Sequence, residues 1–599
     1  ADRVCNARFE LAPHQILVKN FLSFYTPYNS ILLYHGLGTG KTCSAIGIAE
    51  ETRDYLKQLN IRKQILIIAS PNVQDNFRLQ LFDERKLEFI NGGWNIENCV
   101  GNTFLKELNL SSYKDLSREN IIKQINTIIN QYYTFYGYTE FANDIVKTTQ
   151  VKNTTLSENR QRRLSLRQLD EKYSDTLIII DEVQNIRSAD DDRNKLITQQ
   201  LNYLVDNVDS IKLVLLSATP LYNNYQEIIW LINLLNKNDG RSQIEVGDVF
   251  DKNGDFIVDK NGEETGKNLL MRKARGYISF VKGDNPYTFP YRIYPLDFDK
   301  TKSVKNIVYP TLQLNEKKII EPLQHSDIYV NNIGEYQNIG YQYVISYIKN
   351  RQIDIFDKTG TLKTDRFKKL DRFGYTLLQK PIEALNIIYP IENLQTIVDE
   401  NTYNIDPSEL IGKTGLNRLM GYTQTNTPNV RNEYYFKTQT FGNIFALENI
   451  GLYSSKIKSI LDNIINSTGI VMIYSQYIDG GIIPVALALE SLGITRYGDT
   501  SNLFKTPPSE NIDYKTYKTK MALEGSSEFK PAKYIMITGD KSISPNNLKE
   551  LKYATNPDNI DGSRVKVILI SQAAAEGLDF KYIRQLHILD PWYNMNRIE

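Results

Sequence analysis

A glycine-rich turn between a short apolar run and a helical pattern carries the clearest chemistry of the sequence. It reads YHGLGTGKTCSA over residues 34–45. Glycines let a backbone turn tightly and aim successive N–H groups at phosphate oxygens. A lysine and a threonine follow, in the order typical of loops that hold the phosphates and the Mg²⁺ ion of a nucleotide. We therefore expect a phosphate site formed by Gly36, Gly38, Thr39, Gly40, Lys41 and Thr42.

One position departs from the strict pattern G-x-x-x-x-G-K-[ST], because His35 stands where the pattern has its first glycine. The core GTGKT is intact. The alternative is a glycine-rich turn whose lysine merely faces solvent. The apolar run SILLYH before the turn and the helical pattern CSAIGIAEET after it favour the phosphate loop.

An acidic motif, LIIIDEVQNIR at residues 177–187, indicates what happens to the nucleotide. Its four apolar residues predict a buried strand, and Asp181 at the carboxyl end of that strand is expected to bind Mg²⁺ together with Thr42. Glu182 follows directly, and a carboxylate there can take a proton from an attacking water, which favours hydrolysis over transfer. The expected catalytic residues are Lys41, Asp181, Glu182 and Gln184.

A third motif, LLSATPLYNN at residues 215–224, places Ser217 and Thr219 just past another apolar run. Alone this motif is weak, but the order of the three motifs resembles superfamily 2 helicases and translocases. The resemblance implies that Ser217 and Thr219 couple nucleotide to nucleic acid, and that Gln15, in ELAPHQ, reads adenine. It also implies nucleic-acid contacts by Ser70, Pro71, Asn72, Ser475, Gln476, Ser571, Gln572, Gly577 and Asp579.

The segments 275–292 and 534–599 resemble more closely a branch found in large nucleocytoplasmic DNA viruses. This branch includes the poxvirus early transcription factor small subunit and nucleoside triphosphate phosphohydrolase I, with asfarvirus and giant-virus relatives. The resemblance implies a nucleic-acid-dependent ATPase or translocase that uses ATP and Mg²⁺ and serves viral transcription, in initiation or termination. It implies nucleic acid as partner, DNA rather than RNA, with viral RNA polymerase or transcription factor subunits. The expected places are the viral factory in the host cytoplasm and the virion.

Two other functions stay open at this point. One is a helicase that unwinds duplex DNA or RNA, and the other is a non-catalytic scaffold of a viral transcription machine with a vestigial ATP site. The sequence departs from the family in two ways. Gln184 replaces a histidine that often ends the acidic motif. The family's arginine motif falls just beyond Glu599, so we expect the second domain to be truncated before it.

Two sets of apolar runs predict the strands that position these motifs. Continuous runs rich in β-branched residues are typical of buried parallel strands. The first set begins at residues 30, 64, 176 and 211, and the second begins at 469, 533, 564 and 585. The fold class is therefore α/β, and the resemblance implies two RecA-like parallel-sheet domains with a helical or irregular module inserted between them. We place the first domain at 1–240 with an insertion at about 100–170, the module and linker at 241–450, and the second domain at 451–599.

Composition limits the classes of partner. The 71 lysines and arginines nearly balance the 70 aspartates and glutamates, so a global basic field cannot explain nucleic-acid binding. The basic segment 159–172 either touches phosphates or is a solvated, partly disordered insertion. The three cysteines, Cys5, Cys43 and Cys99, predict neither a disulfide framework nor a zinc cluster, which suits a reducing compartment. No apolar run approaches the roughly 20 residues of a membrane span, so we expect a soluble, intracellular protein with no membrane partner.

Overall fold

The structure is a computed structural model of the chain. It describes residues 11–36, 38–90, 93–108, 117–151, 157–186, 192–221, 225–282, 293–313, 317–320, 327–353, 375–400, 402, 404–423, 433–498, 502–523, 529–572, 580 and 582–592. The chain divides into two compact units. Unit 1 comprises residues 1–291 with 592–599, and unit 2 comprises residues 292–591. The predicted limits at 240 and 450 stay predictions.

Unit 1 is built on a sheet whose paired strands all run parallel. The strands lie in the order β5-β2-β6-β7-β1-β8. Their bounds are Ser30–His35 (β1), Ile65–Ile68 (β2), Tyr133–Tyr136 (β5), Leu177–Ile180 (β6), Lys212–Ser217 (β7) and Ile278–Val281 (β8). Because neighbouring strands are parallel, their carboxyl ends meet at one edge, which we call the first sheet edge.

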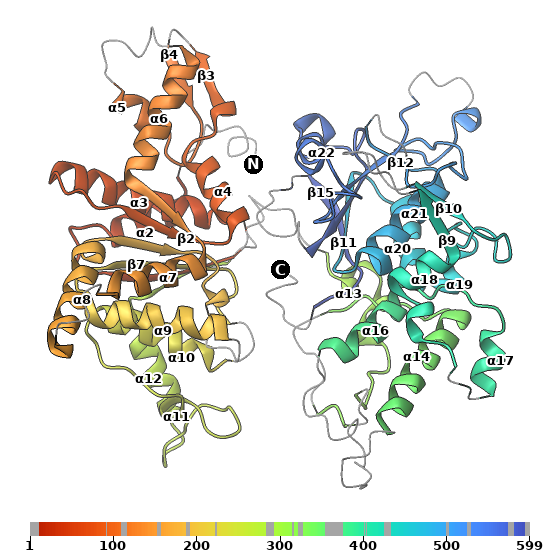
Figure 1. Cartoon of the computed structure of the whole chain (residues 1–599), viewed down its shortest axis with the longest axis horizontal. Helices are drawn as coiled ribbons and strands as arrows, with labels where there is room; N and C mark the ends of the chain where they lie inside the picture. Colours follow the sequence, from red (N-terminus) through yellow and green to blue (C-terminus); the bar gives the residue numbers. More distant parts are fainter. Residues whose placement is uncertain are drawn as a thin grey trace. The chain divides into compact units, whose positions relative to one another are not determined.

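Helices cover both faces of this sheet (Figure 1). Successive residues of the central strands point to opposite faces, so that Ile31 and Leu33 pack in one apolar cluster and Leu32 packs in another. The first cluster includes residues of α2 (Pro13–Phe21), α3 (Lys41–Gln58) and α4 (Pro71–Leu81). The second includes residues of α7 (Tyr138–Thr149), α8 (Glu158–Tyr173), α9 (Asp192–Asn207) and α10 (Glu227–Asn238). Burial on both faces explains why the strand sequences are continuously apolar.

A lobe extends from the α3 side of unit 1 (Figure 1). We define the lobe by the antiparallel strands β3 (Leu87–Ile90) and β4 (Gly93–Ile96) and the helices α5 (Thr103–Glu107) and α6 (Arg118–Tyr132). Its apolar side chains belong to the same core cluster as those of α3. The range predicted as an insertion also contains β5 and α7, which are integral to the sheet and to its covering layer.

The C-terminal part of unit 1 returns to the sheet through α11 (Val246–Val249), α12 (Thr265–Ala274) and the edge strand β8. Two tight turns precede α12, with left-handed glycines at Gly254 (φ 94°) and Gly262 (φ 85°). Asp251 accepts backbone N–H bonds in the first turn, and Asp259 does so in the second. The carboxylates of these two aspartates are therefore engaged in hydrogen bonds with the local backbone.

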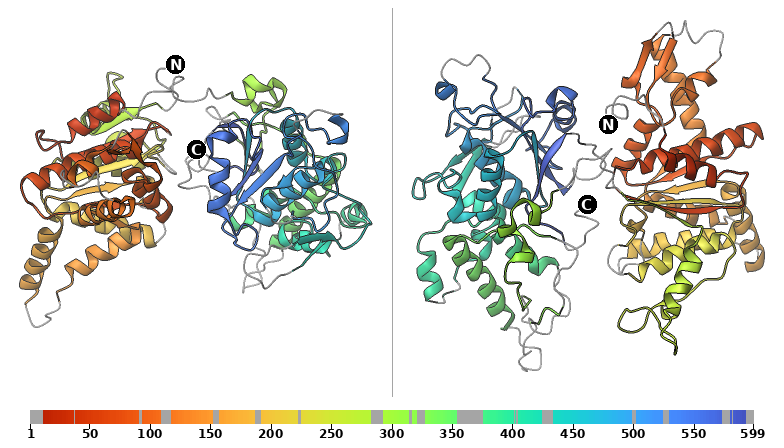
Figure 2. Two further views of the ribbon diagram at one scale, coloured as in Figure 1. Left: turned by 90° about the horizontal axis from the view of Figure 1, so that it is seen from above. Right: turned by 180° about the vertical axis from the view of Figure 1, so that it is seen from behind.

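Unit 2 is built on a second parallel sheet, drawn in shades of blue in Figure 2. Its strands lie in the order β12-β13-β14-β11-β15. The strands are β11 (Ile470–Ser475), β12 (Thr495–Arg496), β13 (Lys533–Ile537), β14 (Val567–Ser571) and β15 (Ile583–Ile588). One face packs on α18 (Gly412–Leu419), α20 (Ser455–Ile465) and α21 (Ile483–Leu492). The other face packs on α22 (Asn547–Ala554).

The tyrosine-rich segment before α18 forms a helical layer of unit 2. Its helices are α14 (Glu335–Ile353), α16 (Tyr375–Asn386) and α17 (Leu394–Asp399), and a separate apolar cluster joins all three. Smaller elements are α13 (Pro295–Phe298), α19 (Ile450–Tyr453) and the antiparallel pair β9 (Met420–Thr423) and β10 (Glu433–Phe436).

All eight predicted strand regions are confirmed, as is the parallel α/β class. The strands β5, β8 and β12 were not predicted. The basic segment 159–172 lies in an ordered helix, α8, rather than in a disordered insertion. Among the described residues, no helix combines the length and apolar character needed to cross a membrane.

Candidate functional site

The glycine-rich turn connects β1 to α3 at the first sheet edge. Gly38 and Gly40 have positive φ angles of 74° and 77°, which favour glycine. The Thr39 hydroxyl donates to the Gly36 carbonyl over 2.7 Å, and the Gly36 N–H donates to Val281 in β8 over 2.8 Å. Gly36 therefore anchors the turn, while the first N–H groups of α3 remain outside the helix's own hydrogen bonds. The geometry is that of an anion cradle at a helix N-terminus.

Lys41 supplies the positive charge of this cradle. Its Nζ atom is buried and has no hydrogen-bond partner among the described residues. A buried, unpaired ammonium group is costly unless an anion neutralises it. The predicted phosphate loop therefore has both the backbone shape and the unpaired cation that a triphosphate requires.

His35 fits the loop because its side chain turns toward the neighbouring strand. It ends β1 and is fully buried, and its Nε2 atom lies 2.9 Å from the Ser279 hydroxyl of β8. Burial, together with the charges of His14 and Lys41, lowers the pKa of His35 to about 4. A neutral side chain at this position explains how histidine replaces the usual first glycine.

Helix α2 holds the loop from the side through two neighbouring residues. Gln15 donates from Nε2 to the Gly40 carbonyl over 3.1 Å, and His14 Nε2 lies 2.9 Å from the Thr39 carbonyl. Gln15 also accepts the N–H of Ala12 over 2.8 Å. The Gln15 side chain thus bonds both to the loop and to the residue that precedes α2. The predicted contact with adenine stays a prediction.

Asp181 and Glu182 follow β6 on the same edge. Asp181 is buried, and burial together with the adjacent Glu182 charge raises its pKa to about 7, while Lys41 opposes this shift. Glu182 adopts a left-handed backbone with φ 48°, an uncommon conformation for this residue type that is often found at functional sites. A divalent cation would remove the electrostatic penalty between the two carboxylates, so the pair fits the predicted Mg²⁺ site with Thr42.

A chain of hydrogen bonds links the acidic motif to the third motif. Gln184 donates to the Glu182 carboxylate and accepts a bond from the Ser217 hydroxyl over 2.7 Å. Ser217 in turn accepts the N–H of Thr219 over 2.9 Å. The structure therefore joins two motifs that the sequence analysis treated as separate, and Gln184 is the joint between them.

Tyr138 is a residue of this edge that the sequence analysis missed. Its hydroxyl donates to the Asp181 carbonyl over 2.7 Å from the start of α7. The pattern YTFYGYTEF, a short aromatic strand followed by glycine and a helix, is the available sequence signal.

The residues predicted to touch nucleic acid in unit 1 lie at the end of β2. Ser70 is the residue before α4, and Pro71 and Asn72 begin that helix. The Ser70 hydroxyl is buried and has no hydrogen-bond partner among the described residues, whereas Pro71 is exposed. These residues follow a strand next to β6, so they share the first sheet edge with Asp181.

The corresponding residues of unit 2 lie at the carboxyl ends of β11 and β14. Ser475 and Ser571 are buried, Gln476 is half-buried and Gln572 is exposed. Asp590 accepts the Ser475 hydroxyl over 2.5 Å and the Gln476 N–H over 2.8 Å. The Ser475 side chain is therefore held inside unit 2. Gly577 and Asp579 lie outside the described residues.

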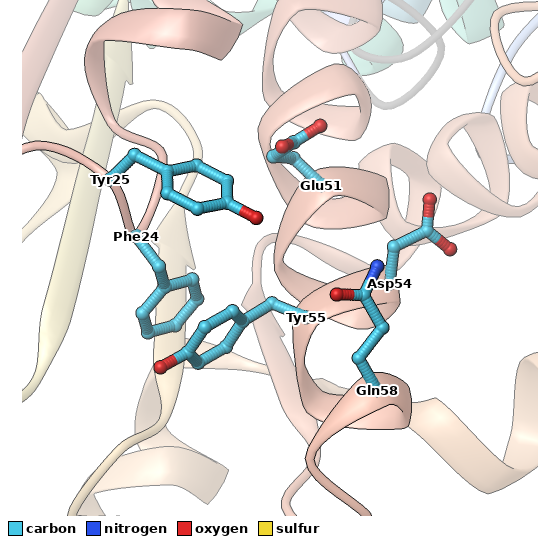
Figure 3. Close-up of a pocket in the computed structure, with 6 residues that line it drawn as sticks. All are labelled: Phe24, Tyr25, Glu51, Asp54, Tyr55 and Gln58. Carbon is cyan, nitrogen blue, oxygen red and sulfur yellow. The ribbon is translucent and has the colours of Figure 1, made fainter.

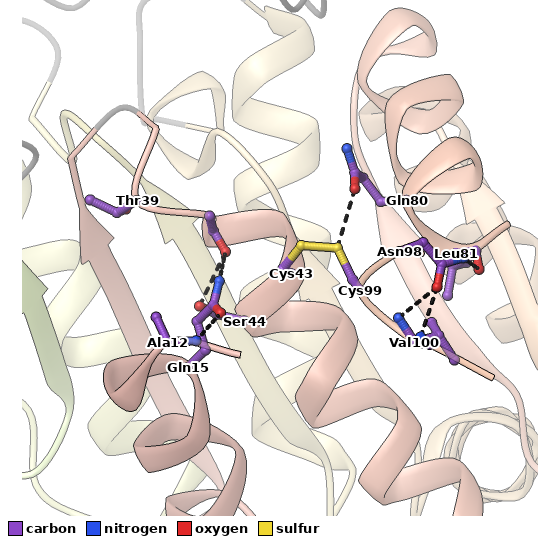
Figure 4. The surroundings of a disulfide bond; sticks show 12 residues. Ala12, Gln15, Thr39, Cys43, Ser44, Gln80, Leu81, Asn98, Cys99 and Val100 are labelled. Carbon is purple, nitrogen blue, oxygen red and sulfur yellow. Dashed lines mark hydrogen bonds between the residues drawn. A yellow bond between two sulfur atoms is a disulfide. The ribbon is translucent and has the colours of Figure 1, made fainter. Parts of the chain in front are cut away.

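Cys43 and Cys99 correct the expectation drawn from cysteine spacing. The two residues form a disulfide between α3 and the lobe, with their Cα atoms 5.2 Å apart (Figure 4). They are 56 residues apart in the chain, and the fold brings them together. Spacing alone gives no signal for such a pair.

A surface pocket of about 100 Å³ lies farther along α3 (Figure 3). It is lined by Phe24, Tyr25, Glu51, Asp54, Tyr55 and Gln58. None of these residues belongs to the phosphate loop or the acidic motif, so the pocket does not extend the candidate nucleotide site.

Comparisons with known proteins agree with the motif assignment, although no protein-family model matches the chain. A "Putative ATP-dependent RNA helicase" of Acanthamoeba polyphaga mimivirus is 25% identical over 639 residues, covering 100% of this chain and 50% of that protein. A "Putative helicase" of Invertebrate iridescent virus 3 is 22% identical and covers 98% of this chain and 45% of that protein. The chain thus spans about half the length of these relatives.

A further relative matches only a part of the chain. A "Termination factor NPH-I homolog" of African swine fever virus is 33% identical over 154 residues, which is 24% of this chain and 21% of that protein. Among solved structures, the Sulfolobus solfataricus SWI2/SNF2 ATPase core in complex with dsDNA matches at 12% identity, with a TM-score of 0.30 over 97% of this chain and 88% of that chain. That similarity is too low to carry a structural argument. The predicted resemblance to helicases of large DNA viruses is confirmed by the relatives from mimivirus, iridescent virus and African swine fever virus.

Proposed function

We propose that this chain is the ATP-hydrolysing core of a nucleic-acid-dependent translocase of superfamily 2. The observation that carries the proposal is the unpaired Lys41 ammonium group in a glycine cradle, on the same sheet edge as Asp181 and Glu182. The helicase names of the viral relatives support the same activity.

Nucleotide binding follows from the cradle. The N–H groups at the start of α3 and the Lys41 ammonium group meet the β- and γ-phosphates, and His14 and Gln15 hold the carbonyls of the loop in place. Thr42 and Asp181 are the residues that would bind Mg²⁺. When bound, this ion neutralises charge that develops on the phosphate oxygens.

Hydrolysis requires a base beside the γ-phosphate. Glu182 is the candidate, because it is half-buried at the strand end and its carboxylate is held by Gln184. A positioned carboxylate that accepts the proton of the attacking water contributes about 10²- to 10⁴-fold to the rate.

Coupling to nucleic acid would use the same hydrogen-bond chain. A change at the γ-phosphate that moves Glu182 is transmitted through Gln184 to Ser217 and Thr219. Contacts of a translocase to the phosphate backbone position it without reading bases, so we expect no sequence specificity and an affinity that falls with salt.

A more specific proposal concerns the nucleic acid, the partners and the place in which the protein works. We infer DNA as the preferred nucleic acid and a role in viral transcription, with polymerase or transcription factor subunits as partners, in the viral factory and the virion. The similarity to a protein named termination factor homolog supports the transcription role, although it covers 24% of the chain.

The experiment is to measure ATP turnover of the chain with single-stranded DNA, duplex DNA and RNA, each offered alone. Stimulation by any of the three supports a nucleic-acid-dependent motor, and the strongest stimulator identifies its track. Turnover that none of them changes contradicts the proposal. Displacement of a labelled strand from a tailed duplex would favour the helicase alternative.

A further inference from the structure

The disulfide begins in the first turn of the phosphate-binding helix. Cys43 is the third residue of α3 and follows Lys41 and Thr42 directly, so the covalent bond reaches the residues proposed to hold the phosphates and Mg²⁺. Cys99 lies in the lobe, three residues after β4, and is largely buried. Figure 4 shows this bond beside the part of the structure that contains Gln15 and Thr39.

Two ion pairs also attach the lobe to α3, and they lie toward the opposite end of this helix. Arg53 is fully buried and pairs with Glu107 of α5 over 2.6 Å, and Lys57 pairs with the same carboxylate over 3.0 Å. Ten residues separate Cys43 from Arg53, which corresponds to about 15 Å of helix. Opening the disulfide therefore removes the covalent bond between the lobe and the nucleotide end of α3, while the ion pairs toward the far end of the helix remain.

The surroundings of Cys99 also suit a free thiol. The Gln80 amide oxygen lies 3.2 Å from the Cys99 sulfur. A disulfide sulfur has no proton to donate, whereas a thiol does. The site therefore offers a hydrogen-bond acceptor to the reduced form and, with Cα atoms 5.2 Å apart, a suitable backbone spacing to the oxidised form.

We propose that Cys43 and Cys99 are a redox modification site that sets the affinity of the phosphate loop for ATP. The proposal rests on the proposed function. The oxidant is a small-molecule or protein disulfide. The thiolate of one cysteine attacks it to form a mixed disulfide and release one thiolate, and the second cysteine then attacks the protein sulfur and releases another. Two electrons pass from the two cysteines to the oxidant, and two protons leave the cysteines.

The oxidised form binds ATP more tightly. Tying Cys43 to the lobe restricts the turn that carries Lys41 and Thr42, so less freedom is lost when the nucleotide binds. A loss of freedom of this size corresponds to about a threefold to tenfold change in affinity. By thermodynamic reciprocity, bound nucleotide makes the disulfide harder to reduce by the same factor.

The test is a titration of the chain with a fluorescent, non-hydrolysable ATP analogue and Mg²⁺, before and after reduction with dithiothreitol. We expect affinity to fall about threefold to tenfold on reduction. Cys43→Ser and Cys99→Ser are expected to bind the analogue with the affinity of the reduced protein, and dithiothreitol is expected to leave that affinity unchanged. Cys5→Ser, at the third cysteine, is the matched control and is expected to keep the full response.

A second measurement does not depend on the cysteine variants. Peptide mapping of unreduced protein in glutathione buffers gives the fraction of Cys43 bonded to Cys99, with and without the analogue. We expect bound analogue to raise that fraction. Equal affinity in both redox states, or no bonded peptide under oxidising buffers, overturns the redox proposal and leaves the proposed function standing. Loss of analogue binding in both states contradicts the proposed function itself.

Discussion

The two sheets share a parallel α/β plan, but their carboxyl edges differ in how completely their polar groups are paired. At the first sheet edge, the Lys41 ammonium group has no hydrogen-bond partner among the described residues, and two adjacent carboxylates repel one another. At the edge of the second sheet, Asp590 accepts bonds from the Ser475 hydroxyl and the Gln476 N–H. The first edge thus needs a ligand to balance its charges, whereas the described network around Asp590 is balanced within the protein.

This difference shows how one architecture serves two purposes. Buried polar groups are normally paired, so an unpaired charge in a well-packed unit indicates a site kept ready for a ligand. A paired network such as that of Asp590 instead stabilises its unit. Lys456 completes that network by donating to Asn386 over 3.1 Å and to the Leu589 carbonyl over 2.7 Å.

The largest expected effect is on turnover. Glu182→Gln keeps the shape of the side chain but removes the base, so we expect ATP turnover to fall about 10²- to 10⁴-fold while affinity for Mg-ATP changes little. Steady-state turnover and analogue binding measure the two quantities. Glu490→Gln is the control in unit 2, where a buried carboxyl group with a pKa raised by burial to about 7 serves structure. Wild-type turnover in Glu182→Gln would show that another group is the base.

The next effect is on the stability of unit 2. Asp590→Ala leaves the Ser475 hydroxyl, the Gln476 N–H and the nearby Lys456 charge without their carboxylate. We expect the free energy of unfolding of unit 2 to fall by about 3 kcal/mol, as for other broken buried charge networks. Urea denaturation measures it.

Asp558→Ala is the matched control for that change, because its partner Arg564 lies in an exposed ion pair. It is expected to change the free energy of unfolding by less than about 1 kcal/mol. If the two variants unfold at the same urea concentration, the Asp590 network is not a structural element.

A smaller effect is expected on the coupling between nucleic-acid binding and ATP hydrolysis. Ser217→Ala breaks the link between Gln184 and the Thr219 N–H. We expect basal hydrolysis to remain, and the stimulation by nucleic acid to fall about fivefold to thirtyfold, as expected from the loss of two hydrogen bonds that contribute about 0.5 to 1 kcal/mol each. Equal losses of basal and stimulated turnover would assign Ser217 a purely structural role.

A further effect concerns the dependence of stability on acid pH. His35 has a folded-state pKa of about 4, below its ordinary 6.5, so the native state binds fewer protons than the unfolded state between these values. Its contribution to stability is therefore complete above pH 6.5 and is lost as the pH falls toward 4. His14, Lys41 and Ser279 are the polar neighbours. Urea midpoints at pH 4.5 and 7.5 are expected to differ less in His35→Gln than in the wild type, and an identical difference would contradict this account.

The sequence predicted the strands that are buried on both faces and the partly exposed edge strand β15, but it missed the edge strands β5, β8 and β12. The run LIII of β6 is apolar throughout, and the run SILLYH of β1 is apolar between its terminal serine and histidine, because both faces of these strands are covered. The strands β5 and β8 are partly exposed edge strands with the mixed sequences YTFY and ISFV, and β12 has two residues. Their places in the sheets depend on tertiary pairing, which no local pattern records.

The residues of the candidate site also fall into two groups, those that a local motif predicts and those that it does not. Local motifs identified Lys41, Asp181, Glu182 and Ser217, because phosphate and metal chemistry fixes residue types at close spacing. The contacts of Gln184 with Ser217, of Tyr138 with Asp181 and of Cys43 with Cys99 join distant parts of the chain. Contacts of this kind require the fold.

The central claim is that the unpaired ammonium group of the first sheet edge is the phosphate ligand of this protein. Its most direct test is to compare Mg-ATP affinity in the wild type, Lys41→Ala and Lys57→Ala, by titration with a fluorescent analogue. Lys57 lies on the same helix but pairs with Glu107 in the lobe. We expect Lys41→Ala to weaken binding about tenfold to hundredfold, as for loss of a charge-assisted contact, and Lys57→Ala to bind like the wild type. Equal affinity in all three proteins would contradict the claim.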